Sequence, residues 1–325
     1  MTLFSWGNPR YFPRLPPPTR RYFEVDHDAR VLAQCHWQPE PWRTPTLLAL
    51  HGLNGSSDAH YMRGLAAKAY ARGMNVVRLN QRNCGDTEDL CAGLFHSGLT
   101  ADAARVIAEL TEVDGQRRIA IAGYSLGGNL ALKLAGEYGD HPPPALAGVA
   151  AVSPIIEIGD CVKSLEQPRN FLYQWNFVRD LKRRMRRKGS FWPGRFDLGL
   201  LPRIRTVREF DEAYTAPHFG FKDAADYYYR ASAMRVIDRI RIPALIITAE
   251  DDPFVPSDAF RNRRVTGNPC IQLVVCGHGG HCGFVGPAAD DDDGYWAENQ
   301  IVEFVDRLTS LDPTRSGSAL AAARR

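Results

Sequence analysis

Short apolar runs that alternate with segments of helical spacing are the feature that most constrains the fold of this chain. Each run is bounded by glycine, proline or polar residues, as buried strands commonly are. Strands that alternate with helices form a mostly parallel sheet with helices on both faces, so the sequence predicts an α/β protein. The predicted strands cover residues 22–37 (one or two strands), 46–50, 75–79, 118–124, 145–154, 243–250 and 271–276. The predicted helices cover residues 62–73, 99–110 (with Thr100 as a cap), 126–139 and 296–308.

The alternation stops between residues 156 and 235, where arginine, lysine and aromatic residues become frequent. We interpret this segment as a helical cap over the ligand-binding edge of the sheet; a plain surface insertion is the alternative. The predicted organisation is an N-terminal extension (1–20), a core in two parts (21–155 and 236–312), the cap insertion (156–235) and a disordered tail (313–325).

Composition excludes several classes of protein. The 325 residues include 40 basic and 37 acidic ones, and a net charge of +3 is too small to indicate a nucleic-acid partner. No apolar run reaches the roughly 20 residues of a membrane span. The N-terminus lacks the basic start, apolar core and cleavage site of a signal peptide. The 7 cysteines are odd in number and scattered, which favours reduced thiols in a cytoplasmic protein.

A candidate nucleophile lies in the stretch Gly123-Tyr124-Ser125-Leu126-Gly127. The GxSxG pattern alone is common by chance, but here an apolar strand runs into it and a helix rich in alanine and leucine leaves it. This is the setting in which a serine is held on a sharp, strained turn. The following helix points its first N–H groups toward any oxyanion that forms there. The alternative is a glycine-rich turn in which the serine has only a structural role.

The acid partner of such a serine is expected later in the chain, followed by the histidine. The strand at 243–250 ends in Glu250-Asp251-Asp252, at the edge where parallel sheets bind ligands. We predict Asp252 as the acid because it lies further into the loop, beside Pro253. Asp251 is expected only to solvate the strand end.

Two histidines follow the last predicted strand, in the stretch GHGGHCGF (277–284). We predict His281 as the general base, since it lies deeper in the loop and the two glycines before it let the backbone approach Ser125. His278 is expected to position the loop. A zinc site is the alternative, but its spacing does not suit a structural site built from two separated pairs of ligands. Its ligands would be Cys276, His278, His281 and Cys282.

The oxyanion hole needs two backbone donors. The N–H of Leu126, directly after the nucleophile, is one. The loop after the strand at 46–50, LALHGLNGSS (48–57), offers the N–H of Leu53 as the other. His51 in this loop is expected to pack the loop rather than to contact substrate.

These motifs together resemble the YheT-like esterases of the α/β-hydrolase superfamily, which are related to the ABHD1/ABHD2/ABHD3 group. The resemblance implies the α/β-hydrolase fold, a triad of Ser125, Asp252 and His281, and ester or thioester substrates. One departure is Asn83, where the family usually has glycine, and it concerns the detail of that loop. The matching stretches are HGLNGSS (51–57), RNCG (82–85), FHSGLTAD (95–102), GYSLGGN (123–129), REFDEAYTAPHFGFKDAADYYY (208–229), DDPFVP (251–256) and HGGHCGFVG (278–286).

The predicted function is that of a serine hydrolase that cleaves carboxylic esters through an acyl-enzyme, with no metal or organic cofactor. Two alternatives stay open: transfer of the acyl group to an alcohol, and a non-catalytic lipid-binding or small-molecule-binding member of the fold. The expected partner is a small ester with an apolar acyl chain.

Two features of the cap have no settled role at the level of sequence. The run 182–188 carries six positive charges in seven residues and is either a solvated helix face or a contact with an anionic membrane. The aromatic residues either line an apolar acyl pocket or form the core of the cap itself. They are Phe171, Tyr173, Trp175, Phe177 and Tyr227–Tyr229.

Overall fold

One twisted sheet organises the molecule. The computed structural model describes residues 2, 10–12, 14–288 and 293–310, and within them eight strands lie in the order β1-β2-β4-β3-β5-β6-β7-β8. β2 pairs antiparallel with β1 and β4, and all other pairs are parallel. The prediction of a mostly parallel α/β sheet is therefore confirmed. The strands are β1 (Thr19–Asp26), β2 (Ala29–His36), β3 (Thr46–Leu50), β4 (Asn75–Leu79), β5 (Ile119–Tyr124), β6 (Leu146–Val152), β7 (Ala244–Ala249) and β8 (Ile271–Cys276).

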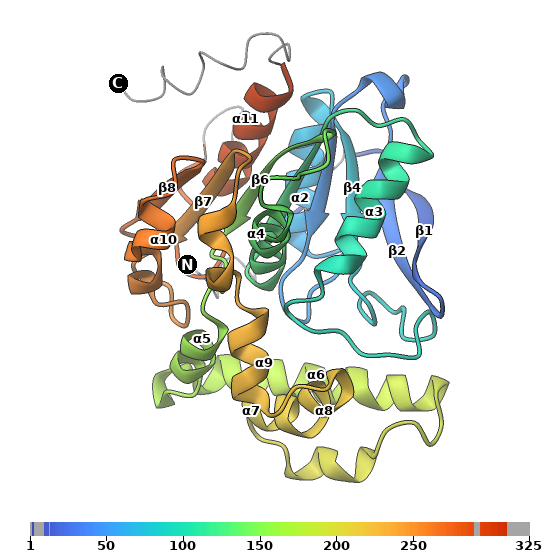
Figure 1. The fold of residues 1–325 in the computed structure, drawn as a ribbon, viewed down its shortest axis with the longest axis vertical. Helices are drawn as coiled ribbons and strands as arrows, with labels where there is room; N and C mark the ends of the chain where they lie inside the picture. Colours follow the sequence, from blue (N-terminus) through green and yellow to red (C-terminus); the bar gives the residue numbers. More distant parts are fainter. Residues whose placement is uncertain (1, 3–9, 13, 289–292, 311–325) are drawn as a thin grey trace.

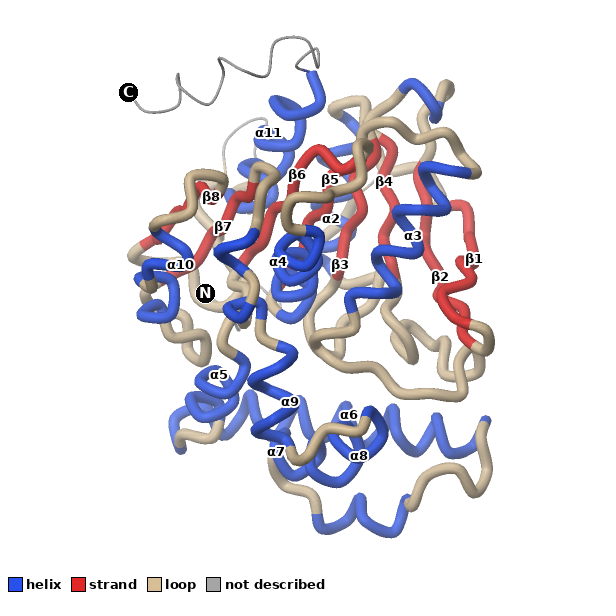
Figure 2. Tube along the Cα trace, in the orientation of Figure 1, coloured by secondary structure: helices blue, strands red, loops and turns tan. Residues whose placement is uncertain are grey.

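Helices cover both faces of this sheet (Figure 1; Figure 2). On one face lie α3 (Thr100–Glu112) and α4 (Leu126–Tyr138), and on the other α2 (His60–Ala71) and α11 (Trp296–Ser310). The short α10 (Arg263–Thr266) precedes the edge strand β8. None of the helices in the described part of the chain combines the length and apolar character needed to cross a bilayer.

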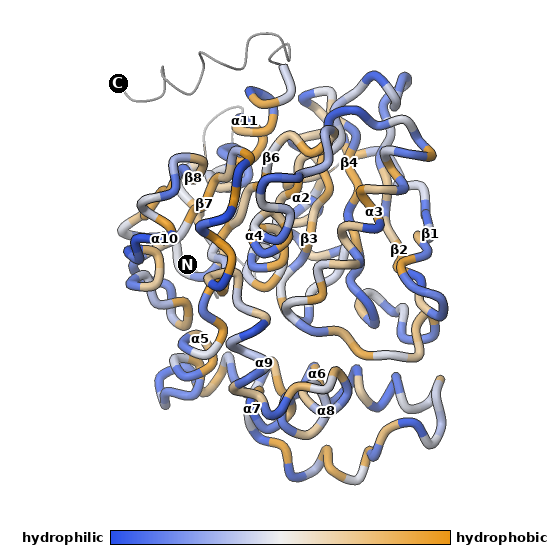
Figure 3. The backbone as a smooth tube through the Cα atoms, viewed as in Figure 1, coloured by the Kyte–Doolittle hydropathy of each residue, from blue (hydrophilic) through white to orange (hydrophobic). Residues whose placement is uncertain are grey.

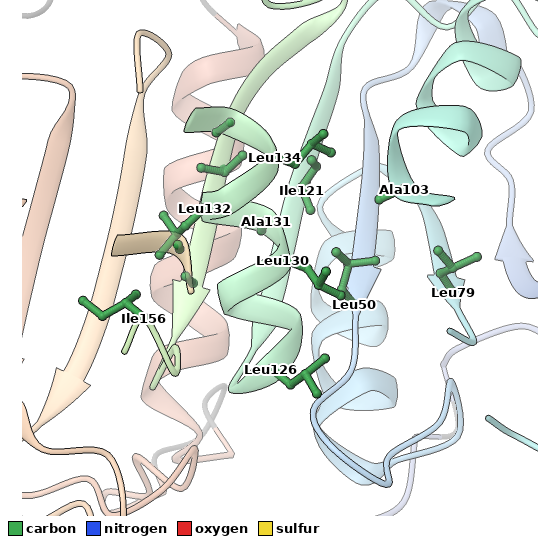
Figure 4. Close-up of a cluster of buried hydrophobic side chains, with 14 of the residues drawn as sticks. Leu50, Leu79, Ala103, Ile121, Leu126, Leu130, Ala131, Leu132, Leu134 and Ile156 are labelled. Atoms are coloured by element: carbon green, nitrogen blue, oxygen red, sulfur yellow. The ribbon is translucent and has the colours of Figure 1, made fainter. Parts of the chain in front are cut away.

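The strands are apolar on both sides because both sides are buried. In β3, Leu48 and Leu50 belong to the cluster that includes α3 and α4, whereas Leu47 and Ala49 pack with α2 and α11. Figure 3 shows this pattern as a largely hydrophobic colour along β6 and β7. Figure 4 shows leucines of α4 lying over the sheet, with Leu126 at the first turn of the helix.

The segment 156–235, which we call the helical insertion, lies below the carboxyl ends of the strands (Figure 1). Its apolar residues are continuous with the core, since Phe177 and Leu181 belong to the same buried cluster as Leu126. The residues Asp211–Thr215 form a π-helical turn. The α-helices of the insertion are α5 (Ile158–Leu165), α6 (Phe171–Phe191), α7 (Val207–Phe210), α8 (Ala216–Phe219) and α9 (Ala224–Ala231).

The N-terminal cap of α3 differs from the prediction. Thr100 does not cap α3: Leu99 occupies the cap position, and the Thr100 hydroxyl donates to Glu137 at 2.5 Å. The expectation of a cap failed because the Glu137 carboxylate takes the hydroxyl as a donor. The tail predicted to be disordered (313–325) lies outside the described residues.

Candidate active site

Ser125 sits at the junction of β5 and α4 with a backbone that few serines adopt. Its φ is 54° and its ψ is −113°, in a positive-φ region that favours glycine. The strain is supported by fixed neighbours, because the Ser125 N–H donates to the Val152 carbonyl at 2.8 Å and the Ser125 carbonyl accepts from the Asn129 N–H at 3.0 Å. Strained positions of this kind persist where the surrounding structure enforces them, often at functional sites.

Glycines make this turn sterically possible. A Cβ on Gly123 would overlap the Gly127 carbonyl, and a Cβ on Gly127 would overlap the Leu50 carbonyl. Gly52 in the loop after β3 also lies against the turn, 3.2 Å from the Ser125 Cβ when a Cβ is built on it. The pattern that flanks the serine in the sequence is thus a packing requirement.

His281 and Asp252 form a buried pair. The His281 Nδ1 lies 2.9 Å from the Asp252 Oδ2, and the two side chains are 5% and 0% exposed. The other carboxylate oxygen of Asp252 accepts from the N–H groups of Phe254 (3.1 Å) and Val255 (2.9 Å). Because both oxygens are bound, the carboxylate has one orientation, and it faces the imidazole.

The pKa of His281 is raised above its usual value. Burial disfavours the charged imidazolium, but the Cys282 sulfur and the Asp252 carboxylate both favour it and together outweigh burial. The pair is thus arranged to stabilise a proton on the ring, as a general base requires once it has accepted one.

Asp251 has a more specific place than the sequence suggested. Its Oδ1 accepts from the N–H groups of Gly279 (2.8 Å) and Gly280 (2.7 Å), and its other oxygen lies 3.6 Å from the exposed His278. The prediction that Asp251 only solvates the strand end was therefore wrong. It ties down the loop that carries His281, a contact between loops that sequence spacing does not display.

The backbone amides of Leu53 and Leu126 are the two predicted donors to an oxyanion. The neighbouring Gly52 N–H donates to the Tyr61 hydroxyl at 3.1 Å, whereas no acceptor for Leu53 N–H or Leu126 N–H lies among the described residues. The predicted packing role of His51 is consistent with its environment. It is 1% exposed, its Nδ1 donates to the Gly52 carbonyl at 2.8 Å, and its Nε2 accepts from the Gln81 N–H at 3.1 Å.

Ser125 and His281 line the same hollow, which we call the triad cavity and which has a volume of about 180 Å³. Leu53 lines it too, and Phe177 and Asp180 of α6 form its wall on the insertion side. Within the described residues no hydrogen bond joins the Ser125 and His281 side chains directly. The structure thus brings all five predicted residues to one region, and the N-terminus returns to it, since the Thr2 hydroxyl accepts from the His281 N–H at 2.7 Å.

A second hollow, the deep cavity, lies between the sheet edge and the insertion and measures about 110 Å³. It shares Leu53 with the triad cavity and reaches Leu126. Its wall is mainly apolar, with Leu94, Ile155, Ile158, Val162, Leu181, Met185, Val207 and Phe210.

The loop that departs from the family pattern binds the insertion. Asn83 has a φ of 62°, which explains why glycine suits this position and why asparagine is tolerated there. Its carboxamide accepts from the Lys188 Nζ at 2.6 Å and donates to the Gly93 carbonyl at 3.0 Å. Lys188 is 1% exposed and also donates to the carbonyls of Glu88 and Cys91, so the loop and α6 are held together.

Helix α6 places the basic residues of the run 182–188 in two different environments. Arg184 and Lys188 line the deep cavity, whereas Arg183 and Arg187 are exposed and pair with carboxylates of the protein. This arrangement favours a solvated helix face over a free membrane contact.

The aromatic residues of the insertion lie in different environments. Phe177 lines the triad cavity, Tyr227 and Tyr228 line the deep cavity, Tyr173 packs against Phe254, and Phe171, Trp175 and Tyr229 are exposed.

The four candidate zinc ligands do not come together. All four of its candidate ligands are described, and no three of them bring their ligand atoms within 4.8 Å of one another. His281 instead turns its Nδ1 to Asp252, and the Cys282 thiol faces the Val152 carbonyl at 3.7 Å. The group of described residues that does meet this distance is the exposed turn Asp26-His27-Asp28, far along the chain from the site.

The chain is similar to known proteins over most of its length. Residues 45–287 match the protein family described as alpha/beta hydrolase fold. The Escherichia coli (strain K12) protein named Putative esterase YheT is 32% identical over 302 residues, which are 91% of this chain and 88% of that protein. Phospholipase ABHD3 of Mus musculus is 30% identical over 74% of this chain and 58% of its own length. The Saccharomyces cerevisiae protein named Medium-chain fatty acid ethyl ester synthase/esterase 2 is 27% identical over 94% of this chain and 69% of its own length.

Solved structures share the fold at low identity. The Pyrococcus furiosus esterase Pf2001 superposes with a TM-score of 0.59 at 16% identity, over 89% of this chain and 92% of that one. Est1E from Butyrivibrio proteoclasticus gives a TM-score of 0.58 at 15% identity, over 90% and 99% of the two chains.

Proposed function

Since the chain belongs to the α/β-hydrolase family, and within it to the YheT-like group, we propose that it cleaves carboxylic esters with Ser125 as the nucleophile. The observation that carries this proposal is the strained Ser125 turn, which opens into the same cavity as a histidine bound to a buried carboxylate. A non-catalytic binding protein has no need to keep either the strain or the buried charge.

In the proposed reaction the Ser125 Oγ attacks the acyl carbon and its proton passes to Nε2 of His281. Asp252 holds the imidazole by Nδ1 and stabilises its charged form. The N–H groups of Leu53 and Leu126 bind the oxyanion. The alcohol leaves with the proton from His281, and water then attacks the acyl-enzyme by the same route in reverse, which releases the acid and regenerates Ser125.

We assign the acyl chain to the deep cavity. That cavity begins at Leu53 and Leu126, whose amides hold the carbonyl oxygen in the proposed reaction, and its wall is mainly apolar. Several polar side chains that line it are already bound within the protein. Asp211 accepts from the hydroxyls of Thr215 (2.7 Å) and Tyr228 (2.8 Å), so its charge does not stand open to the cavity.

Acyl transfer to an alcohol is the second candidate, and the name of the yeast relative, a synthase/esterase, favours keeping it. The two reactions share the acyl-enzyme and differ only in whether water or an alcohol attacks it. Product analysis with added ethanol separates them: ethyl ester in excess of free acid indicates transfer.

The proposal is tested with p-nitrophenyl butyrate, the purified protein and its Ser125→Ala variant. We expect hydrolysis by the wild type and a loss of about a thousandfold or more in kcat for the variant. A variant that retains wild-type kcat, or a folded wild type without activity on any ester of a chain-length series, would contradict it.

A further inference from the structure

Three hollows lie in series along the junction of the sheet and the insertion. The triad cavity and the deep cavity share Leu53 in their walls. The deep cavity in turn shares His96 with a third hollow, the surface groove, which measures about 680 Å³. His96 therefore stands between a mainly apolar cavity that reaches Leu126, the residue after the nucleophile, and a groove at the molecular surface.

We propose that His96 is the end wall of the acyl-binding cavity and sets the length of acyl chain that this protein accepts. The inference rests on the proposed function, since it assumes an ester whose acyl chain enters the deep cavity.

The ring of His96 is built in as a rigid partition. It packs edge-on against Phe219, Phe221 and Tyr227, with centroid distances of 4.4, 5.5 and 5.9 Å. The Gly98 N–H donates to its Nδ1 at 3.1 Å, which fixes the ring orientation. A side chain held by aromatic contacts on several sides cannot swing away without a gap in its place.

The chemistry of the ring suits the end of an apolar pocket. Burial, with the positive charges of Lys133 and Arg82 nearby, lowers the pKa of His96 to about 3, so the imidazole is uncharged. A neutral aromatic ring can contact a terminal methyl group at little cost, which a charged one cannot.

The surface groove, on the other side of His96, differs from the deep cavity in its lining. The surface groove is lined by charged side chains, among them Lys133, Glu137, Arg230 and Arg264, together with the aromatic rings of Phe219, Phe221 and Tyr229. An acyl chain that ends before His96 stays within the mainly apolar cavity, whereas one that passes it enters a groove with charged side chains and gains less from burial. The wall therefore divides chains that fit from chains that do not.

The measurement is kcat/KM for p-nitrophenyl esters of rising acyl length, from acetate to palmitate, with the wild type and two variants. For the wild type we expect a rise of about fourfold for each methylene group that the cavity buries, followed by a fall once the chain reaches the wall. His96→Ala should move the optimum to longer chains, so that an ester two carbons beyond the wild-type optimum gains about 15-fold relative to that optimum. His96→Trp should move it to shorter chains.

Tyr229→Ala is the matched control. Tyr229 lines the surface groove but not the deep cavity and is 60% exposed, so its removal should leave the profile unchanged. Opposite shifts in the two His96 variants cannot come from a general loss of stability. If His96→Ala does not fold, the shift of the optimum to shorter acyl chains in His96→Trp tests the role of His96.

Unchanged profiles in folded His96 variants that still hydrolyse short esters would overturn the role of His96 and leave the proposed function intact. A profile that follows the length of the alcohol in alkyl acetates, and not that of the acid, would overturn the assignment of the cavity to the acyl chain. Absence of Ser125-dependent hydrolysis in the wild type would instead refute the proposed function itself.

Discussion

Replacing Asp252 by asparagine should disable the proposed base by forcing the wrong tautomer on His281. One carboxylate oxygen of Asp252 accepts from the N–H groups of Phe254 and Val255, and the other lies 2.9 Å from the His281 Nδ1. In Asp252→Asn only the amide oxygen can accept from the two backbone donors. The NH₂ group must then face His281, whose Nδ1 becomes an acceptor and whose proton moves to Nε2.

A ring with its proton on Nε2 cannot take the proton of Ser125. Loss of the correct tautomer in a serine triad costs about ten-thousand-fold in kcat, which corresponds to about 5.4 kcal/mol. We expect a loss of this order for Asp252→Asn, measured with p-nitrophenyl butyrate, and a thermal stability close to that of the wild type because the backbone contacts persist. A kcat within tenfold of the wild type would refute the reasoning.

The neighbouring Asp251→Asn is the matched control, since it makes the same chemical change one residue away. Asp251 accepts both of its backbone hydrogen bonds on a single oxygen, and an amide oxygen can replace that oxygen. Its kcat should stay within tenfold of the wild type. An equal loss in both variants would mean that the charge near the loop matters, and not the tautomer.

The pH dependence of Asp252→Asn follows from the same contact. His281 acts as a base only when it is neutral. Burial lowers the pKa of His281, but Asp252 is among the groups that raise it above its usual value. In the wild type kcat/KM should rise as pH rises through this pKa. Without the carboxylate the pKa falls, so the acidic limb of the residual activity should move to lower pH. A limb that stays in place would contradict the role of Asp252.

Three further changes test other parts of the structure. Gly127→Ala should abolish activity and lower the melting temperature, because a Cβ there meets the Leu50 carbonyl; full activity in a calorimetrically normal variant would speak against the packing of the turn. Lys188→Met should lower the free energy of unfolding by about 3 kcal/mol, since three oxygen acceptors lose a buried donor; urea denaturation measures this, and a change below 1 kcal/mol would be inconsistent with it. Asp251→Ala should lower kcat/KM about tenfold by loosening the loop at residues 279–280, and should lower the free energy of unfolding by about 1–3 kcal/mol because two buried N–H groups lose their acceptor; an unaltered kcat/KM would count against that loop contact.

The sheet could be predicted from sequence because its strands carry a strong local signal. The runs at 46–50 and 75–79 coincide with β3 and β4, since a strand buried on both faces is apolar throughout. The residues of the candidate site were also predicted from local context, because each lies in the turn or loop that follows a strand.

Contacts between distant segments could not be predicted in this way. Lys188 stands in a run of six charges, and nothing in that run marks it as the one that reaches Asn83 from α6. The positive φ of Asn83 is likewise set by the tertiary fold. The wall formed by His96 depends on three aromatic residues more than a hundred positions later in the chain, so only the folded structure brings it into view.

The central claim, an activated Ser125, is tested most directly by reaction with a fluorophosphonate probe and identification of the modified residue by mass spectrometry. The account predicts stoichiometric modification of Ser125 in the wild type, strong loss of labelling in His281→Ala, and none at this position in Ser125→Ala. A folded wild-type protein whose Ser125 is not modified, or is modified equally fast in His281→Ala, would contradict it.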